Sequence, residues 1–428
     1  MAVPRIGVCH APGAAANLRE LYVAARDVCE VVLLVRESVA RRHPDLVGLA
    51  GKLFECHEVA DAPDPAALST LDLQGVTTFH DEELDVADAL DAVVRGAPAP
   101  ANPWDKLVQR RVLAAAGIGR VRAVAVDLPD DLLAGFAHLD GPCVLKPRRA
   151  AGGDGIAFLD DDSDVAAQLA RRTKWSGLLL ETAIAPHRHP SGDPWLGDLL
   201  SVETVTVGGE RTHLGVLDKL PVAVARGDGP HGTDSVSVQG DILPSKLPDD
   251  DLRGAIALTD RALDALGVGS RITHTELRIT PDGLEVLEVN GRLAGHTARL
   301  FRLAGGPDLV ALALRAALGQ PPAGPVSLTG AAAGLFPAFP TRSGPVLSAT
   351  SRRALRSLPG VAAVDDLAVM GAARAASDHR LANLTVAGAD RAAVDAGIDG
   401  VLRAIAAMFA ADGVTVERLF AAVLAERA

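Results

Sequence analysis

Short apolar runs and amphipathic stretches alternate along the first 95 residues. The apolar runs have the length of buried strands and occupy residues 5–9, 28–35, 52–59 and 74–79. Two further stretches, residues 15–26 and 84–94, repeat their apolar positions at helical spacing. Strands and helices that alternate in this way form parallel sheets. The pattern therefore predicts an open parallel α/β sheet within residues 1–97.

Three consecutive acids, Asp81-Glu82-Glu83, stand between the fourth apolar run and the second helix. Acidic side chains at the start of a helix interact favourably with the helix dipole. We therefore interpret these acids as a helix cap rather than as residues that take part in chemistry.

The middle of the chain, residues 104–320, follows a Pro/Ala linker and mixes strands with helices. Its predicted helices cover residues 103–116, 130–136, 252–266 and 307–318. Its predicted strands cover residues 120–126, 142–147, 156–159, 175–181, 198–207 and 213–216. We interpret this part as one domain with a mobile lobe at about residues 120–184.

A second Pro/Gly linker, residues 319–325, precedes a mixed C-terminal part. Strands are predicted there at residues 326–337, 361–369 and 381–388, and helices at 390–410 and 415–426. The fold class is therefore predicted as mixed α/β, with domains at residues 1–97, 104–320 and 321–428.

Residues 273–292 carry the clearest hairpin pattern in the chain. Two runs of β-branched and aliphatic residues flank Pro281-Asp282-Gly283. This triplet suits a three-residue loop, with Pro at the start of a type I turn and Gly in the left-handed conformation. Such a loop would pair Thr280 with Leu284.

Counting outward from that loop sets Glu276 opposite Glu288, with Asn290 on the same face. Like charges that face each other across two strands repel. One interpretation is that a divalent cation lies between these groups, because carboxylate and amide oxygens are hard ligands of the kind Mg²⁺ takes. The other is a solvated hairpin face with scattered acids, and the spacing alone does not separate the two.

A glycine-rich turn, residues 148–156, follows an apolar strand that ends in Lys146. A strand rather than a helix leaves the turn, and no Gly-Lys-Ser/Thr occurs, so it is not a Walker loop. Gly152, Gly153 and Gly155 would let backbone NH groups approach a ligand closely. The turn is therefore either a lid over phosphates or a purely structural β-turn.

Composition narrows the class of protein. Of the 428 residues, 48% are hydrophobic and 22% charged, as in a soluble globular protein. A net charge of −12 argues against binding of nucleic acids or membrane surfaces. The four Cys residues are far apart, and the first ten residues lack a signal-peptide pattern, so we expect a reduced cytoplasmic setting.

Lysine is rare in a chain that strongly favours arginine. Six of the 42 basic residues are Lys, at positions 52, 106, 146, 174, 219 and 246, and 36 are Arg. The compact ammonium group makes a point-charge contact that a wide guanidinium does not reproduce.

Four features in chain order carry a family resemblance. They are Asp105-Lys106, Leu145-Lys146-Pro147 with the glycine turn, the strand ending in Glu181 and Ile184, and the hairpin His274-x-Glu276…Glu288-x-Asn290-x-Arg292. Over residues 104–319 this order resembles the ATP-grasp superfamily, preceded by a pre-ATP-grasp α/β domain. The segments 197–203 (Gly-Asp-Leu-Leu-Ser-Val-Glu) and 290–296 (Asn-Gly-Arg-Leu-Ala-Gly-His) look like those of its carboxylate–amine ligases, in the amino-acid ligase and peptide-antibiotic branch.

The resemblance implies roles for the residues that would bind ATP. Lys106 and Lys146 would contact phosphates and adenine. Gly152, Gly153 and Gly155 would cover the phosphates. Glu181, followed by the hinge Ala183 and Ile184, would recognise adenine. The usual Gly-x-Glu acid for the ribose is absent, and Asp198 or Glu203 would replace it.

The resemblance also implies a metal site and a catalytic cation. Glu276, Glu288 and Asn290 would bind Mg²⁺, with Mn²⁺ as an alternative, and Arg292 together with Lys146 would face the reacting phosphate. Lys219 either reaches the triphosphate or is a surface lysine.

Three further residues have open roles. His274 and His296 either assist deprotonation of an amine or are packed histidines. Arg342 is a candidate for contacting substrate from the last domain.

The implied activity is ATP-dependent joining of a small-molecule carboxylate to an amine through an acyl phosphate, in a possible homodimer. Two alternatives stay open. One is an enzyme like biotin carboxylase or the purine-pathway enzymes, which use bicarbonate or formate as the acid. The other is a non-catalytic nucleotide-binding protein on the same fold.

Overall fold

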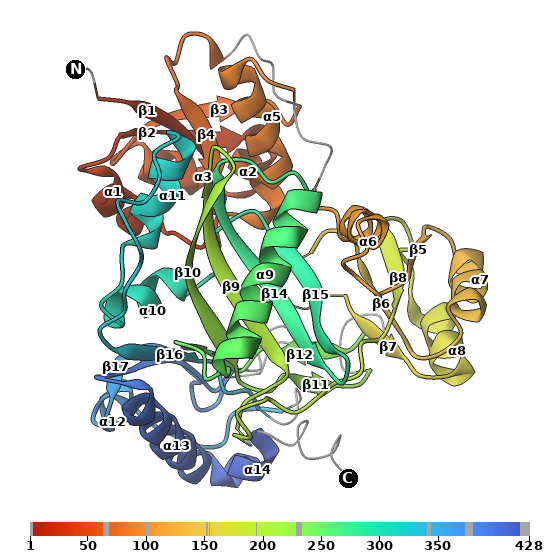
Figure 1. Cartoon of the computed structure of the whole chain (residues 1–428). Coiled ribbons are helices and arrows are strands. Elements are labelled where there is room, and N and C mark those ends of the chain that lie inside the picture. The colour runs from red at the N-terminus through yellow and green to blue at the C-terminus, as the bar shows by residue number, and fades with distance from the viewer. Residues whose placement is uncertain are drawn as a thin grey trace.

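The computed structural model contains three large sheets, a small two-stranded sheet, and helices on the faces of the large ones (Figure 1). It describes residues 3–62, 68–98, 103–150, 153, 155–193, 195–227, 233–339, 344–372 and 380–419. The predicted mixed α/β class is confirmed. In the view of Figure 1 the N-terminal sheet is at the top and the C-terminal helices are at the bottom.

The N-terminal sheet is parallel, as predicted, with strand order β3-β2-β1-β4. Its strands are β1 (Arg5–Cys9), β2 (Glu30–Arg36), β3 (Glu55–Val59) and β4 (Gly75–Thr78). Its helices are α1 (Leu18–Ala25), α2 (Glu37–Arg42), α3 (Pro44–Ala50) and α5 (Leu84–Arg95), with the 3-10 turn η1 (Asp81–Glu83) before α5. The short α2 and α3 were not predicted, because neither is long enough to show a clear helical repeat.

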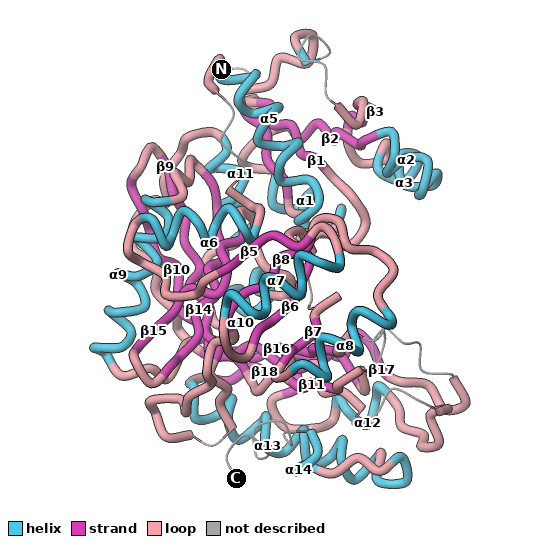
Figure 2. The backbone as a smooth tube through the Cα atoms, turned by 90° about the vertical axis from the view of Figure 1, so that its right-hand side faces the viewer, coloured by secondary structure: helices cyan, strands magenta, loops and turns pink. Residues whose placement is uncertain are grey.

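A second sheet of four antiparallel strands has the order β5-β8-β6-β7. Its strands are β5 (Ala123–Val126), β6 (Cys143–Pro147), β7 (Ala157–Leu159) and β8 (Leu178–Thr182). The helices of this region are α6 (Lys106–Ala115), α7 (Pro129–Leu139) and α8 (Asp162–Arg171). Figure 2 looks onto this side of the molecule, with α7 and α8 in front of the eight-stranded sheet.

The third sheet has eight antiparallel strands in the order β15-β14-β9-β10-β13-β16-β18-β17. These are β9 (Leu199–Val207), β10 (Glu210–Lys219), β13 (Gly240–Leu243), β14 (Arg271–Thr280), β15 (Gly283–Asn290), β16 (Ala331–Leu335), β17 (Val361–Leu367) and β18 (Ala382–Gly388). Between β10 and β13 lies the small sheet of β11 (Ala223–Ala225) and β12 (Ser235–Ser237). The helices are α9 (Asp249–Ala265), α10 (Thr297–Leu303), α11 (Leu309–Ala317), α12 (Arg352–Arg356), α13 (Arg391–Met408) and α14 (Val416–Leu419).

The eight-stranded sheet runs without a break across the linker at residues 319–325. Strand β16 pairs with β13 from Gly240↔Leu335 to Leu243↔Ala332, so the C-terminal strands extend the same sheet. The proposed division of the chain near residue 320 stays a prediction.

The hairpin β14–β15 has a register that differs from the predicted one at its tip. Thr280 pairs with Gly283, so the loop has two residues, and the predicted pairing of Thr280 with Leu284 is wrong. A bulge at Leu287 then inserts one extra residue on β15, and Glu276 faces Glu288 as predicted. The two departures cancel, because each shifts the register by one residue.

The N-terminal sheet is attached to the rest of the chain by polar and apolar contacts. Helix α11 packs against α1, with which it shares a core, and against β4. Trp104 donates its indole NH to Asp88 at 2.7 Å, and Arg271 binds the same carboxylate and stacks on the Trp104 ring. These contacts fix the N-terminal part relative to the β14–β15 hairpin.

In the part of the chain that the structure describes, none of the helices has both the length and the apolar character needed to cross a membrane.

Candidate active site

One large cavity, of about 1230 Å³, is lined by residues of the antiparallel sheet β5-β8-β6-β7, the hairpin β14–β15 and the C-terminal strands. Most of the predicted site residues line it. They are Lys106, Lys146, Gly153, Glu181, Ile184, Asp198, Lys219, Glu276, Glu288, Asn290 and Arg292. The structure therefore brings together residues that lie almost 190 positions apart in the sequence.

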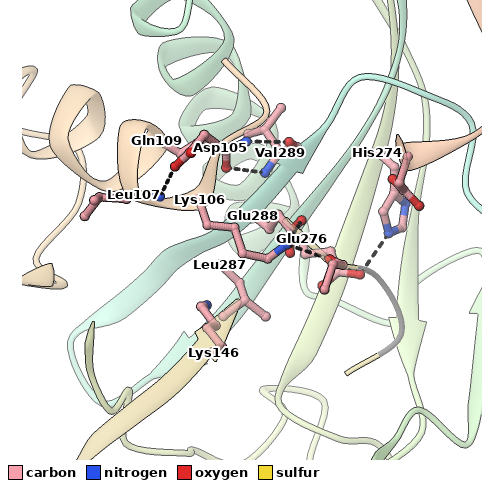
Figure 3. A network of polar contacts seen from close by, with 12 residues as sticks. Asp105, Lys106, Leu107, Gln109, Lys146, His274, Glu276, Leu287, Glu288 and Val289 are labelled. Atoms are coloured by element: carbon pink, nitrogen blue, oxygen red, sulfur yellow. Dashed lines mark hydrogen bonds and ion pairs between the residues drawn. The ribbon is translucent and has the colours of Figure 1, made fainter. Parts of the chain in front are cut away.

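The two facing acids of the hairpin each have a lysine partner. Lys106 Nζ lies 2.8 Å from Glu288 Oε1 (Figure 3). Lys219 Nζ lies 3.6 Å from Glu276 Oε1. Lys219 also donates to Asp241 Oδ1 at 2.9 Å and is buried, so it is not the surface lysine of the alternative interpretation. The lysines offset the repulsion that two adjacent carboxylates would otherwise feel.

The same acids fit a divalent ion that carries part of its own ligand shell. Glu276, Glu288 and Asn290 all line the cavity and offer hard oxygen atoms. Across the described ranges, no three His, Cys, Asp or Glu side chains gather closely enough to hold a metal by themselves. A Mg²⁺ ion bound by these three residues would therefore need phosphate oxygens or water to complete its coordination, which is its usual mode in nucleotide sites.

The surroundings of Glu276 favour its ionised form. Burial opposes its charge, but Lys219 and His274 hold the pKa of Glu276 well below its usual range. His274 Nε2 lies 3.1 Å from Glu276 Oε1, and His274 Nδ1 lies 2.5 Å from Glu203 Oε1. Both ring nitrogens are thus occupied, so the packed role of His274 is the one that the geometry supports.

A buried ion-pair cluster lies where β6 and β8 line the cavity. Lys146 Nζ is 2.5 Å from Glu181 Oε1, and Arg110 Nε is 2.7 Å from Glu181 Oε2. All three side chains are at least nine-tenths buried. Burial alone would raise the pKa of Glu181, but Arg110 and Lys146 lower it to about 2. The same burial lowers the pKa of Lys146, despite the nearby acid.

Arg110 was missed by the sequence analysis. It lies on α6 four residues after Lys106, a spacing that places both side chains on one helical face. Its guanidinium also donates to the carbonyls of Val286 at 2.6 Å and Leu287 at 2.9 Å. The spacing from Lys106 was available in the sequence, but an arginine in an arginine-rich chain gave no reason to select it.

The glycine turn approaches the small β11–β12 sheet. Gly153 has a φ of +78°, and a Cβ atom there would lie 2.9 Å from Val236 Cβ. Gly155 has a φ of +76° and faces Pro147 in the same way. Both positions therefore require glycine for conformation and for space. Gly152 lies outside the described residues, as does Arg342.

The predicted adenine hinge is only partly available to a ligand. The backbone NH of Ala183 donates to Pro142 O at 2.8 Å, which leaves its carbonyl as the group that could face a nucleotide. Ile184 lines the cavity.

Of the two candidate ribose acids, one faces the cavity. Asp198 lines it and accepts from Arg278 Nε at 2.6 Å. Glu203 is fully buried beside His274. Burial disfavours the charged imidazole, but Glu203 outweighs this effect and raises the pKa of His274 to about 9.

Arg292 is held in place by an acid that the sequence analysis interpreted as a helix cap. Asp81 accepts two hydrogen bonds from its guanidinium, at 2.7 and 2.6 Å. No local pattern signals this contact, because Asp81 lies in η1 after β4 and Arg292 follows β15, 211 residues later. Four residues after Arg292, His296 has a φ of +65° and packs against Phe336, with ring centroids 4.6 Å apart and the ring planes tilted by 37°.

No protein-family model matches the chain. An alanine–anticapsin ligase of Bacillus subtilis is 23% identical over 281 residues, which are 59% of this chain and 56% of the ligase. An uncharacterized protein of Sinorhizobium fredii is 26% identical over 221 residues, which are 50% of this chain and 42% of that protein. The chain thus spans about half the length of these curated relatives.

Solved structures are similar over almost the whole chain. An L-amino acid ligase of Bacillus licheniformis superposes with a TM-score of 0.65 and 17% identity, covering 93% of this chain and 98% of that one. An N5-carboxyaminoimidazole ribonucleotide synthetase of Thermotoga maritima gives 0.64 and 18%, covering 94% and 97%. These proteins share their overall fold with this chain, which has the ATP-grasp fold.

Proposed function

We propose that the chain is an ATP-dependent ligase that joins a carboxylate to an amine through an acyl phosphate and releases ADP and phosphate. The observation that carries this proposal is the pairing of Lys106 with Glu288 opposite Glu276, inside the large cavity. The sequence similarity to an alanine–anticapsin ligase supports an amino acid or a peptide-like acid as the carboxylate.

The nucleotide would lie between the antiparallel sheet β5-β8-β6-β7 and the hairpin β14–β15. Lys106 and Lys146 would exchange part of their contact with Glu288 and Glu181 for phosphate oxygens, which carry more charge. Gly153 and its neighbours would cover the phosphates, and Asp198 would accept from the ribose. The adenine would face Ile184 and the carbonyl of Ala183.

Glu276, Glu288 and Asn290 would hold Mg²⁺, or Mn²⁺ in its place. The bound ion would neutralise phosphate charge and align the phosphates for an in-line displacement. Arg292 and Lys219 would add positive charge where negative charge develops on the transferred group.

The chemistry requires no nucleophilic side chain. A carboxylate oxygen attacks the γ-phosphorus, and the bond to the bridging oxygen of ADP breaks. The amine nitrogen then attacks the acyl carbon, the bond from that carbon to the phosphate oxygen breaks, and the amine gives up a proton. His296 lines the cavity, and burial lowers its pKa, so the ring is available as an acceptor for that proton. The glycine turn would exclude water, which hydrolyses acyl phosphates.

A second candidate is an enzyme that uses bicarbonate or formate as its acid. The N5-carboxyaminoimidazole ribonucleotide synthetase superposes about as well as the L-amino acid ligase, with TM-scores of 0.64 and 0.65, and this similarity supports the second candidate. A non-catalytic role is less well supported, because a protein that only binds nucleotides has no need of two facing acids that are each matched by a lysine.

A phosphate-release screen tests these alternatives. The chain is incubated with MgATP and pairs of amino acids, with bicarbonate, or with formate, and products are identified by mass. Phosphate release that depends on amino acids, with a product heavier by the second amino acid less water, is the expected result. Release that depends on bicarbonate or formate alone would establish the second candidate.

A cytoplasmic setting and a homodimer stay predictions. Activity in a reduced cell extract and the mass of the purified protein in solution would test them.

A further inference from the structure

The cavity continues beyond Arg292 to an end that is built from the C-terminal strands. We call this the C-terminal end of the cavity; its lining residues are His296, Phe336, Asp366, Arg380 and Asn383. Phe336 follows β16, Asp366 is in β17, Arg380 lies two residues before β18, and Asn383 is in β18. None of the roles proposed for ATP or Mg²⁺ uses Phe336, Asp366, Arg380 or Asn383.

Arg380 is fixed by stacking. Its guanidinium carbon lies 5.3 Å from the centroid of the Phe336 ring. A guanidinium that stacks on an aromatic face keeps its in-plane N–H groups free for a planar anion. Among the residues described here, Arg380 forms no ion pair, whereas Arg278 and Arg292 in the same cavity are bound to Asp198 and Asp81.

An amide oxygen without a partner among the described residues belongs to Asn383, which lines the same cavity as Arg380. Asn383 Oδ1 is buried and, within the described part of the chain, has no hydrogen-bond partner. Buried polar atoms without partners cost free energy, and they are uncommon in folded proteins. The C-terminal end of the cavity thus offers a planar cation, which donates to a carboxylate, and an unpartnered amide oxygen, which accepts from a neighbouring N–H or O–H group of the ligand.

Packed residues connect the C-terminal end of the cavity to Arg292. Arg292 and His296 belong to one short segment, His296 packs against Phe336, and the Arg380 guanidinium lies over the Phe336 ring. A substrate that contacts Arg380 would therefore reach towards Arg292 past Phe336 and His296. Asp366 also lines this end and lies 4.0 Å from Arg352, so the local charge is mixed rather than uniformly positive.

We propose that Arg380 binds the carboxylate of the amine substrate, and that this substrate is accordingly a free amino acid or a peptide with a free carboxyl end. The proposal rests on the ligase function proposed above. The amine nitrogen would attack the acyl phosphate near Arg292 while its own carboxylate stays ionised and unreacted at Arg380. Simple amines without a carboxylate would bind weakly.

The test separates the two half-reactions. Hydroxylamine traps an acyl phosphate as a hydroxamate and carries no carboxylate, so it reports only the first half. The twenty protein amino acids are offered as the acid, with hydroxylamine as the amine. The same acids are then offered with amines in matched pairs, such as glycine against glycinamide. Wild type, R380Q, R380K and R188Q are compared, since Arg188 is another exposed arginine that lines the cavity.

The expected result is a KM for the amino-acid amine at least about 10-fold higher in R380Q, with a smaller change in kcat. Hydroxamate formation and the KM for the carboxamide should stay at wild-type values in R380Q, and R380K should recover part of the loss. R188Q should behave like the wild type towards both members of each pair.

Three results would overturn the inference. In one, R380Q keeps the wild-type KM for the amino acid. In another, R380Q loses hydroxamate formation as well, which would place Arg380 on the acid substrate. In the third, the selective loss appears in R188Q instead. A wild-type protein that forms neither hydroxamate nor any ligated product overturns the ligase proposal itself, and the inference with it.

Discussion

Asp81 and Arg292 lie 211 residues apart in the chain and form a two-point ion pair, with nitrogen–oxygen distances of 2.7 and 2.6 Å. Asp81 belongs to η1 of the N-terminal sheet, and Arg292 follows the hairpin β14–β15. Both side chains are mostly buried. The pair therefore couples the orientation of the proposed catalytic cation to the position of the N-terminal sheet.

Asp81→Asn should lower kcat by about 10-fold, which corresponds to about 1.4 kcal/mol, because it removes the charge that orients Arg292. The measurement is phosphate release at saturating substrates. Glu82→Gln, at the neighbouring exposed position of η1, is the matched control and should leave kcat unchanged. If Asp81→Asn turned over at the wild-type rate, Asp81 would have no positioning role.

Glu288→Gln should reduce turnover by about 100-fold or more, since a metal ion supplies several kcal/mol of transition-state stabilisation. The variant keeps the size of the side chain and removes one anionic ligand. It should also need more Mg²⁺ to reach half of its maximal rate. Glu210→Gln, at an exposed position of β10, is the control. An unaltered Mg²⁺ dependence in Glu288→Gln would contradict the assignment of Glu288 to the metal.

Glu181 should contribute stability that depends on pH. Its pKa in the folded chain is about 2, below the ordinary value of 4.5, so the folded state favours the ionised form. This contribution is complete above pH 4.5 and is lost as the pH falls from about 4.5 towards 2. Urea unfolding between pH 6 and pH 2.5 measures it.

Glu181→Gln is the comparison for that titration. It should be less stable than wild type at pH 6 by roughly 3–5 kcal/mol, because Arg110 and Lys146 would remain buried without their anion. Its stability should also fall less steeply than that of wild type as the solution is acidified. Parallel pH curves for the two proteins would show that Glu181 is not an ionised partner.

Gly153→Ala should weaken ATP binding several-fold. The new Cβ would lie 2.9 Å from Val236 Cβ at a φ of +78°, so the turn would have to move away from β12, and the left-handed conformation alone costs about 1–2 kcal/mol. Titration with a fluorescent ATP analogue measures the effect. Gly254→Ala is the control, because that helical glycine has open space around it and the change should slightly stabilise α9. Equal ATP affinity in Gly153→Ala and wild type would argue against a lid.

The sequence by itself determined most of the longer strands and which residue types are available for chemistry, whereas the short strands β11, β12 and β13 were not predicted from it. The apolar runs of β1, β2 and β8 are local signals, because burial requires apolar side chains at fixed spacing. The lysines and acids of the cavity were recognisable because their order along the chain resembles that of known ligases. These inferences depend on short segments, and the structure agrees with them.

Only the tertiary structure decided the partners and the register. Strand β15 is the edge of its sheet, and Arg110 and Gln109 of α6 bind its outer carbonyls at Leu287 and Val289. The bulge at Leu287, which restores the facing of Glu276 and Glu288, forms where that helix docks. The same holds for Asp81 with Arg292 and for Arg380 with Phe336. In each case the contact joins segments whose approach is set by the packing of whole sheets, and no local pattern of residues encodes it.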